Sequence, residues 1–357
     1  MGLPLFMLEF KTKAETAVSR GSRGVVAVIL ADDTKTTTDC ISYTYTDMTD
    51  VVKSHWTTAN YAYLEMIFKG SPKSVIVERI GTSDDYTAAL ARLKNKKWNW
   101  LTVPGLADAE GTSQILEWIA EQRENKKTFK AVLPCSVMGL TPNSRFIVDF
   151  AADEIKVGTK TYTCAEYCAR IAGVLAGIAL NKSATYYVLN EIDSIKESET
   201  PDADINAGRL IILNDGEKFK IARAVTSLTT LGENEKEEMK KIKIVEAMDF
   251  IFDDIRDVFE SSYIGMANSY DNKQLFVSEV NDYFKKLENQ SVLEPDGGSY
   301  AEIDLAEQRA WLKTQGKDVE NMTDEQIKKA KTGSCIFLTG DLSFLDAIED
   351  LKFTLYM

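Results

Sequence analysis

The stretch from Ser74 to Val103, SVIVERIGTSDDYTAALARLKNKKWNWLTV, decides the fold class. It opens with Ser74–Ile80, an apolar run rich in β-branched residues, which is typical of a strand. Asp84–Leu93 is predicted as a helix, and Trp98–Val103 is a second strand that stops at Pro104. A strand, a helix and another strand in so short a stretch predict a β-α-β unit with parallel strands.

Elements of the same kind lie on both sides of this stretch. Val25–Leu30 is a continuous apolar run and Asn60–Phe68 reads as a helix, while Ser113–Arg123 and Phe129–Leu133 read as a further helix and strand. Repeated β-α units predict a mostly parallel sheet with helices packed on its faces.

Beyond Leu133 the pattern changes. Hairpin strands are predicted at Phe146–Phe150, Ile155–Val157, Thr161–Thr163, Leu210–Leu213 and Phe219–Ala224, with an apolar helix at Cys164–Ile178. Further helices are predicted at Ile244–Phe259, Lys273–Leu287, Leu305–Lys313 and Asp324–Lys331, followed by a turn at Gly340-Asp341. The last of these helices is predicted to begin with a capping box at Thr323, in the pattern Thr-Asp-Glu-Gln. The first of these helices has one apolar face and one acidic face, so we interpret it as a packed helix rather than a carboxylate active site.

Composition excludes several classes of protein. The 357 residues are 44% hydrophobic and 27% charged, enough for a large core in about two domains. The net charge is −13 without a dense basic stripe, so neither nucleic acid nor an anionic membrane is an expected partner. No apolar run is long enough to span a bilayer and no signal peptide is evident, which predicts a cytosolic protein. Five scattered cysteines predict reduced thiols.

Catalytic chemistry is hard to place. His55 is the only histidine and lacks the paired residues of a catalytic or metal site. Cys164 and Cys168 are four residues apart on a predicted helix, where two small buried thiols are the simpler interpretation than a metal site. We therefore predict no catalytic residue, no metal and no cofactor. A doubly wound nucleotide-dependent enzyme remains the alternative, although Val25–Leu30 is followed by Ala-Asp-Asp-Thr instead of a glycine-rich phosphate loop.

Both ends of the chain have the sequence pattern of a short apolar strand that could pair with another strand. Leu351–Met357 alternates apolar and polar residues to the last position, and Leu3–Phe10 is a short apolar strand. Such strands either close the chain's own sheet or add to the sheets of neighbouring copies. Only Pro4, Glu9 and Lys352 protect them against unwanted pairing.

Several separate phrases resemble one family, the contractile phage tail sheath proteins, and most closely the short sheaths of Gram-positive phages and R-type bacteriocins. The resemblance covers nearly the whole chain and rests on 2–26, 155–173, 213–218, 227–230, 241–249 and 340–351.

The resemblance implies a structural polymer and not an enzyme. It implies hexameric rings stacked around a tail tube, which contract to drive the tube through a target cell envelope. The implied fold is α/β with an α+β inner domain: residues 1–23 form an N-terminal arm and linker, 24–240 an inserted outer α/β domain, and 241–357 a C-terminal inner domain with a terminal strand arm. Implied partners are further copies of the chain, the tube protein, and baseplate and tail terminator proteins. Assembly would take place in the bacterial cytoplasm, with release by lysis in a phage tail or tail-like particle.

Two groups of site residues follow. In the terminal arms, which exchange strands between subunits, the apolar contacts are expected from Phe6, Leu8, Phe10, Leu351, Phe353 and Leu355. The basic residues Lys328, Lys329 and Lys331 stand out in an acidic chain and are candidates for contact with the tube. Their alternative role is to compensate the dipole at a helix C-terminus.

Overall fold

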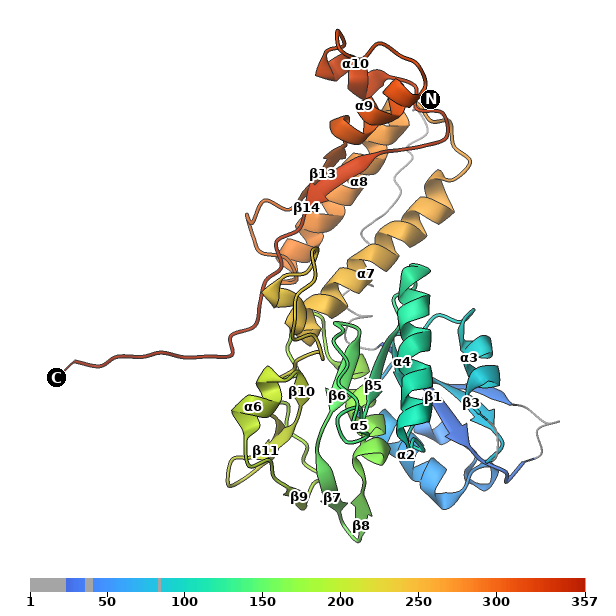
Figure 1. Cartoon of the computed structure of the whole chain (residues 1–357), viewed down its shortest axis with the longest axis vertical. Helices are drawn as coiled ribbons and strands as arrows, with labels where there is room; N and C mark the ends of the chain where they lie inside the picture. The colour runs from blue at the N-terminus through green and yellow to red at the C-terminus, as the bar shows by residue number, and fades with distance from the viewer. Residues whose placement is uncertain (1–23, 36–40, 83–84, 357) are drawn as a thin grey trace, which may run out of the picture. The chain divides into compact units, whose positions relative to one another are not determined.

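The computed structural model describes residues 24–35, 41–82 and 85–356 (Figure 1). Phe6, Leu8 and Phe10 lie outside these residues. The chain divides into two compact units, and one division falls within helix α7 (Ile242–Val258), between Asp249 and Phe250. Residues 24–249 and 347–356 belong to one unit, here called the sheet unit, and residues 250–346 belong to the other, the helical unit.

The described part of the sheet unit is organised around a seven-stranded sheet. In order across the sheet, its strands are β10 (Arg209–Leu210), β6 (Ile147–Phe150), β5 (Lys130–Leu133), β4 (Trp100–Thr102), β1 (Val25–Ala31), β3 (Ser74–Ile80) and β2 (Ser42–Tyr45). Neighbours from β10 to β3 are parallel, and β2 runs antiparallel along β3. The predicted mostly parallel sheet is therefore confirmed.

Helices cover both faces of this sheet, and β1 shows why its sequence is a continuous apolar run. Val26, Val28 and Leu30 contribute to one core, and Ala27 and Ile29 contribute to the core on the opposite face. A strand buried on both sides has no solvent face to alternate with. The helices that supply these cores are α2 (Thr58–Phe68) and α5 (Cys164–Gly177) on the first face, and α3 (Thr87–Leu93) and α4 (Ala109–Glu124) on the second.

Helix α5 is buried along almost its whole length because it packs closely on α2. A Cβ at Gly173 would overlap the Ile67 carbonyl of α2, so only glycine allows this approach. Thr163 and Glu166 begin the helix with a capping box, which satisfies free N–H groups at its N-terminus. Cys164 and Cys168 are both buried free thiols, as the sequence indicated.

The predicted hairpin pairing of Phe146–Phe150 is wrong. Strand β6 lies in the main sheet, parallel to both β5 and β10. All four of its residues are buried, and a short buried run carries no local signal that separates a parallel strand from a hairpin strand. The smaller sheets are β8–β7–β9, formed by Lys160–Tyr162, Asp153–Val157 and Ser194–Lys196, and the β11–β12 hairpin, formed by Ile212–Asn214 and Phe219–Ile221. A short helix, α6, spans Pro201–Asn206.

The helical unit contains the end of α7 and a two-stranded antiparallel sheet. A π-helical turn, η4 (Phe259–Tyr263), follows α7. The other α-helices in the described part of this unit are α8 (Tyr270–Asn289), α9 (Leu305–Thr314) and α10 (Asp324–Lys329), and its strands are β13 (Tyr300–Ile303) and β14 (Leu338–Asp341). The turn predicted at Gly340-Asp341 is wrong, because both residues belong to β14. The pairing with β13, which is remote in sequence, decides this conformation. The capping box of α10 is present as predicted, between Thr323 and Gln326.

Candidate functional site

The C-terminal segment of the sheet unit exposes its apolar side chains. Leu351, Phe353 and Leu355 are 88%, 72% and 77% exposed, and residues 351–356 contain no helix or strand (Figure 1). Thus residues 351–356, here called the C-terminal arm, do not close a sheet within the described part of their own chain. Of the two alternatives for this end, donation to another copy stays a prediction.

Glu349 and Asp350, the two residues before the arm, are here called its root. The buried Glu349 carboxylate holds this root against the rest of the sheet unit. The Glu349 side chain is only 6% exposed. Its Oε1 accepts hydrogen bonds from Ser183 Oγ at 2.9 Å and Thr185 Oγ1 at 2.6 Å. Thr185 Oγ1 in turn accepts a hydrogen bond from the Ala224 N–H at 3.0 Å, so the loop after α5 is tied to both chain segments.

Two cations surround the same root. Arg223 Nη2 lies 2.6 Å from Asp350 Oδ1, while Arg223 Nε and Lys241 Nζ lie 3.9 and 4.0 Å from Glu349 Oε2. Because Glu349 is shielded from solvent, its attraction to these cations is screened less than that of a surface pair. The arm therefore begins from a fixed point while the six residues after Asp350 remain exposed.

The geometry suits strand addition. Six residues at about 3.3 Å each span roughly 20 Å, which is the length of an ordinary strand. Leu351, Phe353 and Leu355 would then share one face of that strand, with Lys352 and Thr354 on the other.

The basic residues lie at the end of α10 in the helical unit. Lys328 and Lys329 are in the last turn, and Lys331 follows the helix. Lys329 Nζ is 3.3 Å from Glu325 Oε2 and 5.6 Å from the centre of the Tyr270 ring. Lys329 and Lys331 are exposed and Lys328 is half-buried. Acidic residues in the first turn and lysines in the last turn are the arrangement that the helix dipole favours. The structure is thus compatible with dipole compensation and with contact to the tube.

The place where a doubly wound sheet would hold a phosphate is filled by the chain itself. The switch in strand order lies at β1, whose carboxyl end leads to Asp32. The buried Asp32 carboxylate accepts hydrogen bonds from the Thr57 N–H and Asn60 Nδ2, each at 2.8 Å, at the start of α2. Burial acts to raise the pKa of Asp32, but hydrogen bonds from Thr34, Asn60 and Thr57 outweigh it and lower that pKa. A resident anion thus occupies this helix N-terminus.

The other residues considered as chemical groups, His55 and the cysteine pair, also lie in structural surroundings. The His55 backbone carbonyl accepts hydrogen bonds from Thr34 Oγ1 and the Arg79 guanidinium. Burial raises the pKa of the Cys168 thiol, which keeps it protonated. Among residues 24–35, 41–82 and 85–356, no group of His, Cys, Asp or Glu side chains is placed to hold a metal ion. No helix in these ranges is both long and apolar enough to cross a membrane.

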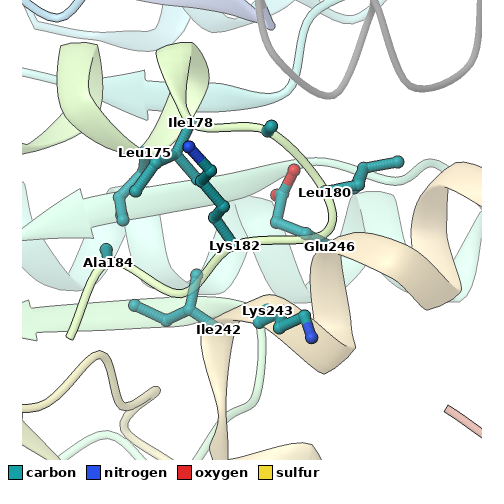
Figure 2. A pocket seen from close by; sticks show the side chains of 9 residues that line it. Leu175, Ile178, Leu180, Lys182, Ala184, Ile242, Lys243 and Glu246 are labelled. Carbon is teal, nitrogen blue, oxygen red and sulfur yellow. The ribbon is translucent and has the colours of Figure 1, made fainter. Parts of the chain in front are cut away.

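A small cavity lies between the loop after α5 and the first turn of α7 (Figure 2). Its volume is about 10 Å³, room for about one water molecule, whereas small-molecule sites have volumes of several hundred cubic ångströms. Leu175, Ile178 and Ile242 contribute much of its apolar lining. This cavity therefore offers no substrate pocket.

A buried ion cluster was not anticipated from the sequence. Lys130 of β5 is 1% exposed, and its Nζ lies 2.9 Å from Glu246 Oε1 and 2.7 Å from Asp249 Oδ2, both on α7. Arg123 binds the two Asp249 carboxylate oxygens at 2.7 and 3.1 Å and stacks on the Phe146 ring. Part of the acidic face of α7 is therefore an attachment to the sheet. A lysine within the apolar run Phe129–Leu133 was the available signal.

Comparison with known proteins shows the family to which the chain belongs. Residues 81–227 match the family model of the phage tail sheath protein central domain, and residues 234–357 match that of the phage tail sheath C-terminal domain. The tail sheath protein of Clostridium phage phiCD119 is 31% identical over 370 residues, covering 100% of this chain and 99% of that protein. The chain belongs to the phage tail sheath family. Sheath proteins are structural and not enzymes, so the nucleotide-dependent alternative is wrong.

Solved sheath structures share the fold at low sequence identity. The sheath tail protein of Listeria innocua is 12% identical with a TM-score of 0.70, over 95% of this chain and 99% of that one. The helical sheath of the anti-feeding prophage in its contracted state is 14% identical with a TM-score of 0.68, over 100% and 99%. A chain of the anti-feeding prophage baseplate is 13% identical with a TM-score of 0.69, over 94% of both. The mixed α/β fold predicted from the sequence is confirmed.

Proposed function

We propose that this sheath protein polymerises as stacked hexameric rings around a tail tube and contracts to drive the tube through a target cell envelope. The exposed C-terminal arm carries the proposal: it has the alternation of a strand, it lies outside any sheet of its own described chain, and its root is fixed at Glu349. Family membership supports the same function.

Many weak joints would hold such a polymer. Burial of Leu351, Phe353 and Leu355 contributes roughly 1.5–3 kcal/mol each. Ordering the arm and losing free rotation consume much of this gain, so one pairing is weak. A closed ring or helical lattice makes many pairings at once and is correspondingly stable. Backbone pairing also preserves which copies are joined while whole subunits move during contraction.

The remaining assignments complete this proposal. Residues 24–240 form the outer domain, and residues 241–357 with the N-terminal arm of 1–23 form the inner domain, where Phe6, Leu8 and Phe10 supply the second set of apolar contacts. The tube protein lines the inside, and baseplate and tail terminator proteins bind the two ends. The particle assembles in the bacterial cytoplasm and leaves the cell by lysis.

Negative-stain microscopy of the purified full chain tests polymerisation directly. We expect rings with six-fold symmetry and tubes built from them, at concentrations where sedimentation also reports large particles. A protein that stays monomeric at every concentration tested, alone and with its tube protein, contradicts the proposal.

A charge reversal tests the proposed tube contact. A polar contact can be released on contraction more readily than a large apolar patch. With Lys328→Glu and Lys329→Glu together, we expect polymers that no longer wrap the tube, measured by microscopy after co-expression with the tube protein. Lys313→Glu with Lys317→Glu, two exposed lysines of the same unit, is the matched control. Normal wrapping by the first variant with only a lower melting temperature supports dipole compensation instead.

A further inference from the structure

A groove lies between helices α3 and α4 of the sheet unit, which are neighbours on one face of the main sheet (Figure 1). Its volume is about 390 Å³, which falls within the range of small-molecule sites and far exceeds that of the cavity in Figure 2. Gln114 Nε2 of α4 donates to Thr87 Oγ1 of α3 at 3.0 Å, so a hydrogen bond joins the two helices where the groove begins.

The buried side of this groove contains an amide without a partner. Gln122 continues the buried stripe of α4 formed by Ile115 and Ile119, and it is 0% exposed. Neither its Oε1 nor its Nε2 has a hydrogen-bond partner in the part of the chain that the structure describes. An unpaired buried amide costs free energy that an apolar side chain at the same position would not. The amide is therefore available to a ligand in the groove that it lines.

The ring of Trp118 lines the same groove and is half-buried. It stacks on the buried Phe129 ring, with centroids 5.9 Å apart and planes 12° apart, and on the buried Trp98 ring, with centroids 6.1 Å apart and planes 11° apart. These contacts fix the orientation of the indole before any ligand binds. A fixed and partly exposed aromatic ring suits contact with the flat apolar side of a ligand.

The rim of the groove carries charges of both signs. Glu117 and Glu121, one turn apart on α4, and Lys94 on α3 all line it and are exposed. A rim with both signs has no strong preference for an anion or for a cation. Carboxylates accept hydrogen bonds from hydroxyl groups and an ammonium group donates to them, so the same rim suits a neutral ligand rich in hydroxyls.

We propose that this groove binds a neutral sugar ring, of which two adjacent hydroxyl groups pair with the Gln122 amide. One hydroxyl donates to Oε1 and its neighbour accepts from Nε2, which supplies the donor and the acceptor that the amide lacks. The apolar side of the sugar packs on Trp118, and further hydroxyls donate to Glu117 and Glu121. The inference goes beyond the proposed function, because it requires neither polymerisation nor contraction.

Two other side-chain amides of this chain show the pairing that Gln122 lacks. Asn281 donates to the C=O and accepts from the N–H of Ala301, both at 2.8 Å, and Asn143 does the same with Thr230 at 2.9 and 3.0 Å. Each partner presents one donor and one acceptor side by side. Adjacent sugar hydroxyls present such a pair, and so does an extended peptide. The sugar is favoured because it also makes use of the aromatic ring and the mixed rim.

Ligand-observed NMR with the full chain tests the class of ligand. Saturation transfer is measured for methyl glucoside, methyl galactoside, methyl mannoside and N-acetylglucosamine at millimolar concentration, with acetyl-trialanine amide as the peptide probe. We expect transfer to at least one sugar and none to the peptide. Transfer to the peptide, or to none of these probes, overturns the proposal.

Deoxy derivatives of the sugar that binds test the pairing itself. Removal of either paired hydroxyl leaves one atom of the amide without a partner, so we expect two derivatives with adjacent positions removed to bind about tenfold more weakly. Equal binding of all the monodeoxy derivatives overturns the pairing with Gln122.

The variant Gln122→Leu distinguishes an amide that serves a ligand from one that serves the fold. Leucine removes the unpaired polar atoms, so we expect a higher melting temperature together with the loss of saturation transfer to the sugar. Gln122→Met is the second variant in case leucine does not fit, and Gln315→Leu, at an exposed position of the helical unit, is the control that should change neither quantity. A lower melting temperature in both Gln122 variants shows that the amide already has a partner within the protein, and unchanged transfer shows that the sugar binds elsewhere. Either result overturns the proposal.

Discussion

Deletion of Lys352–Met357 yields a folded monomer that forms no sheath. This is the expected result because the deletion removes Phe353 and Leu355, which are 72% and 77% exposed, and spares the root at Glu349. Removing exposed residues typically changes the stability of a subunit by less than about 0.5 kcal/mol. The same deletion removes most of the arm from every joint of the polymer at once. Sedimentation and negative-stain microscopy measure the loss of polymer, and circular dichroism measures the retained fold.

Two double variants distinguish the loss of apolar contacts from the mere addition of negative charge to the arm. Phe353→Asp with Leu355→Asp places two charges on the apolar face of the arm, and we expect the same loss of assembly. Thr354→Asp with Tyr356→Asp adds two charges to the opposite face and should assemble far better. If the deletion variant unfolds as completely as a core mutant, the arm belongs to the subunit's own core and strand donation is wrong.

The sequence predicted best those elements whose signals are local. Strand β3 has the predicted bounds, Ser74–Ile80, and α10 begins at the predicted capping box with Thr323. Strands β2 and β13 were missed because short polar-rich runs become strands only through a remote partner. Residues Tyr300–Ile303 pair with a segment nearly forty residues later, and no local pattern reports such a pairing.

At the candidate site, too, the sequence did not reveal contacts between residues that are remote in the chain, as the root of the arm shows. The alternation of Leu351, Phe353 and Leu355 was visible in the sequence, as was the family phrase that contains Glu349. The role of Glu349 was not visible, since Ser183 and Thr185 lie more than 160 positions away. The sequence carries no local sign of this role, because Glu349 lies between two further acidic residues, Asp346 and Asp350, and only tertiary structure supplies its partners.

The ion cluster around Lys130 is expected to have the largest effect on stability. Burial favours the neutral amine, but the carboxylates of Asp249 and Glu246 outweigh it and raise the pKa of Lys130, so the lysine is charged. Glu246 shows the opposite balance: burial raises its pKa more than Lys130 lowers it. Loss of the lysine therefore leaves two carboxylates close together without their shared cation, which is costlier than losing a surface pair.

In Lys130→Met we expect the free energy of unfolding of the sheet unit to fall by about 3–5 kcal/mol. Urea denaturation followed by tryptophan fluorescence measures it, in the Phe353→Asp/Leu355→Asp background so that polymer does not form. Lys73→Met, an exposed lysine of the same unit, is the control and should change stability by less than about 0.5 kcal/mol. Adding Glu246→Gln to Lys130→Met should restore part of the loss, because Arg123 and Asp249 still pair and less unbalanced charge remains buried. Equal stability of Lys130→Met and Lys73→Met would show that the cluster does not fasten α7 to the sheet.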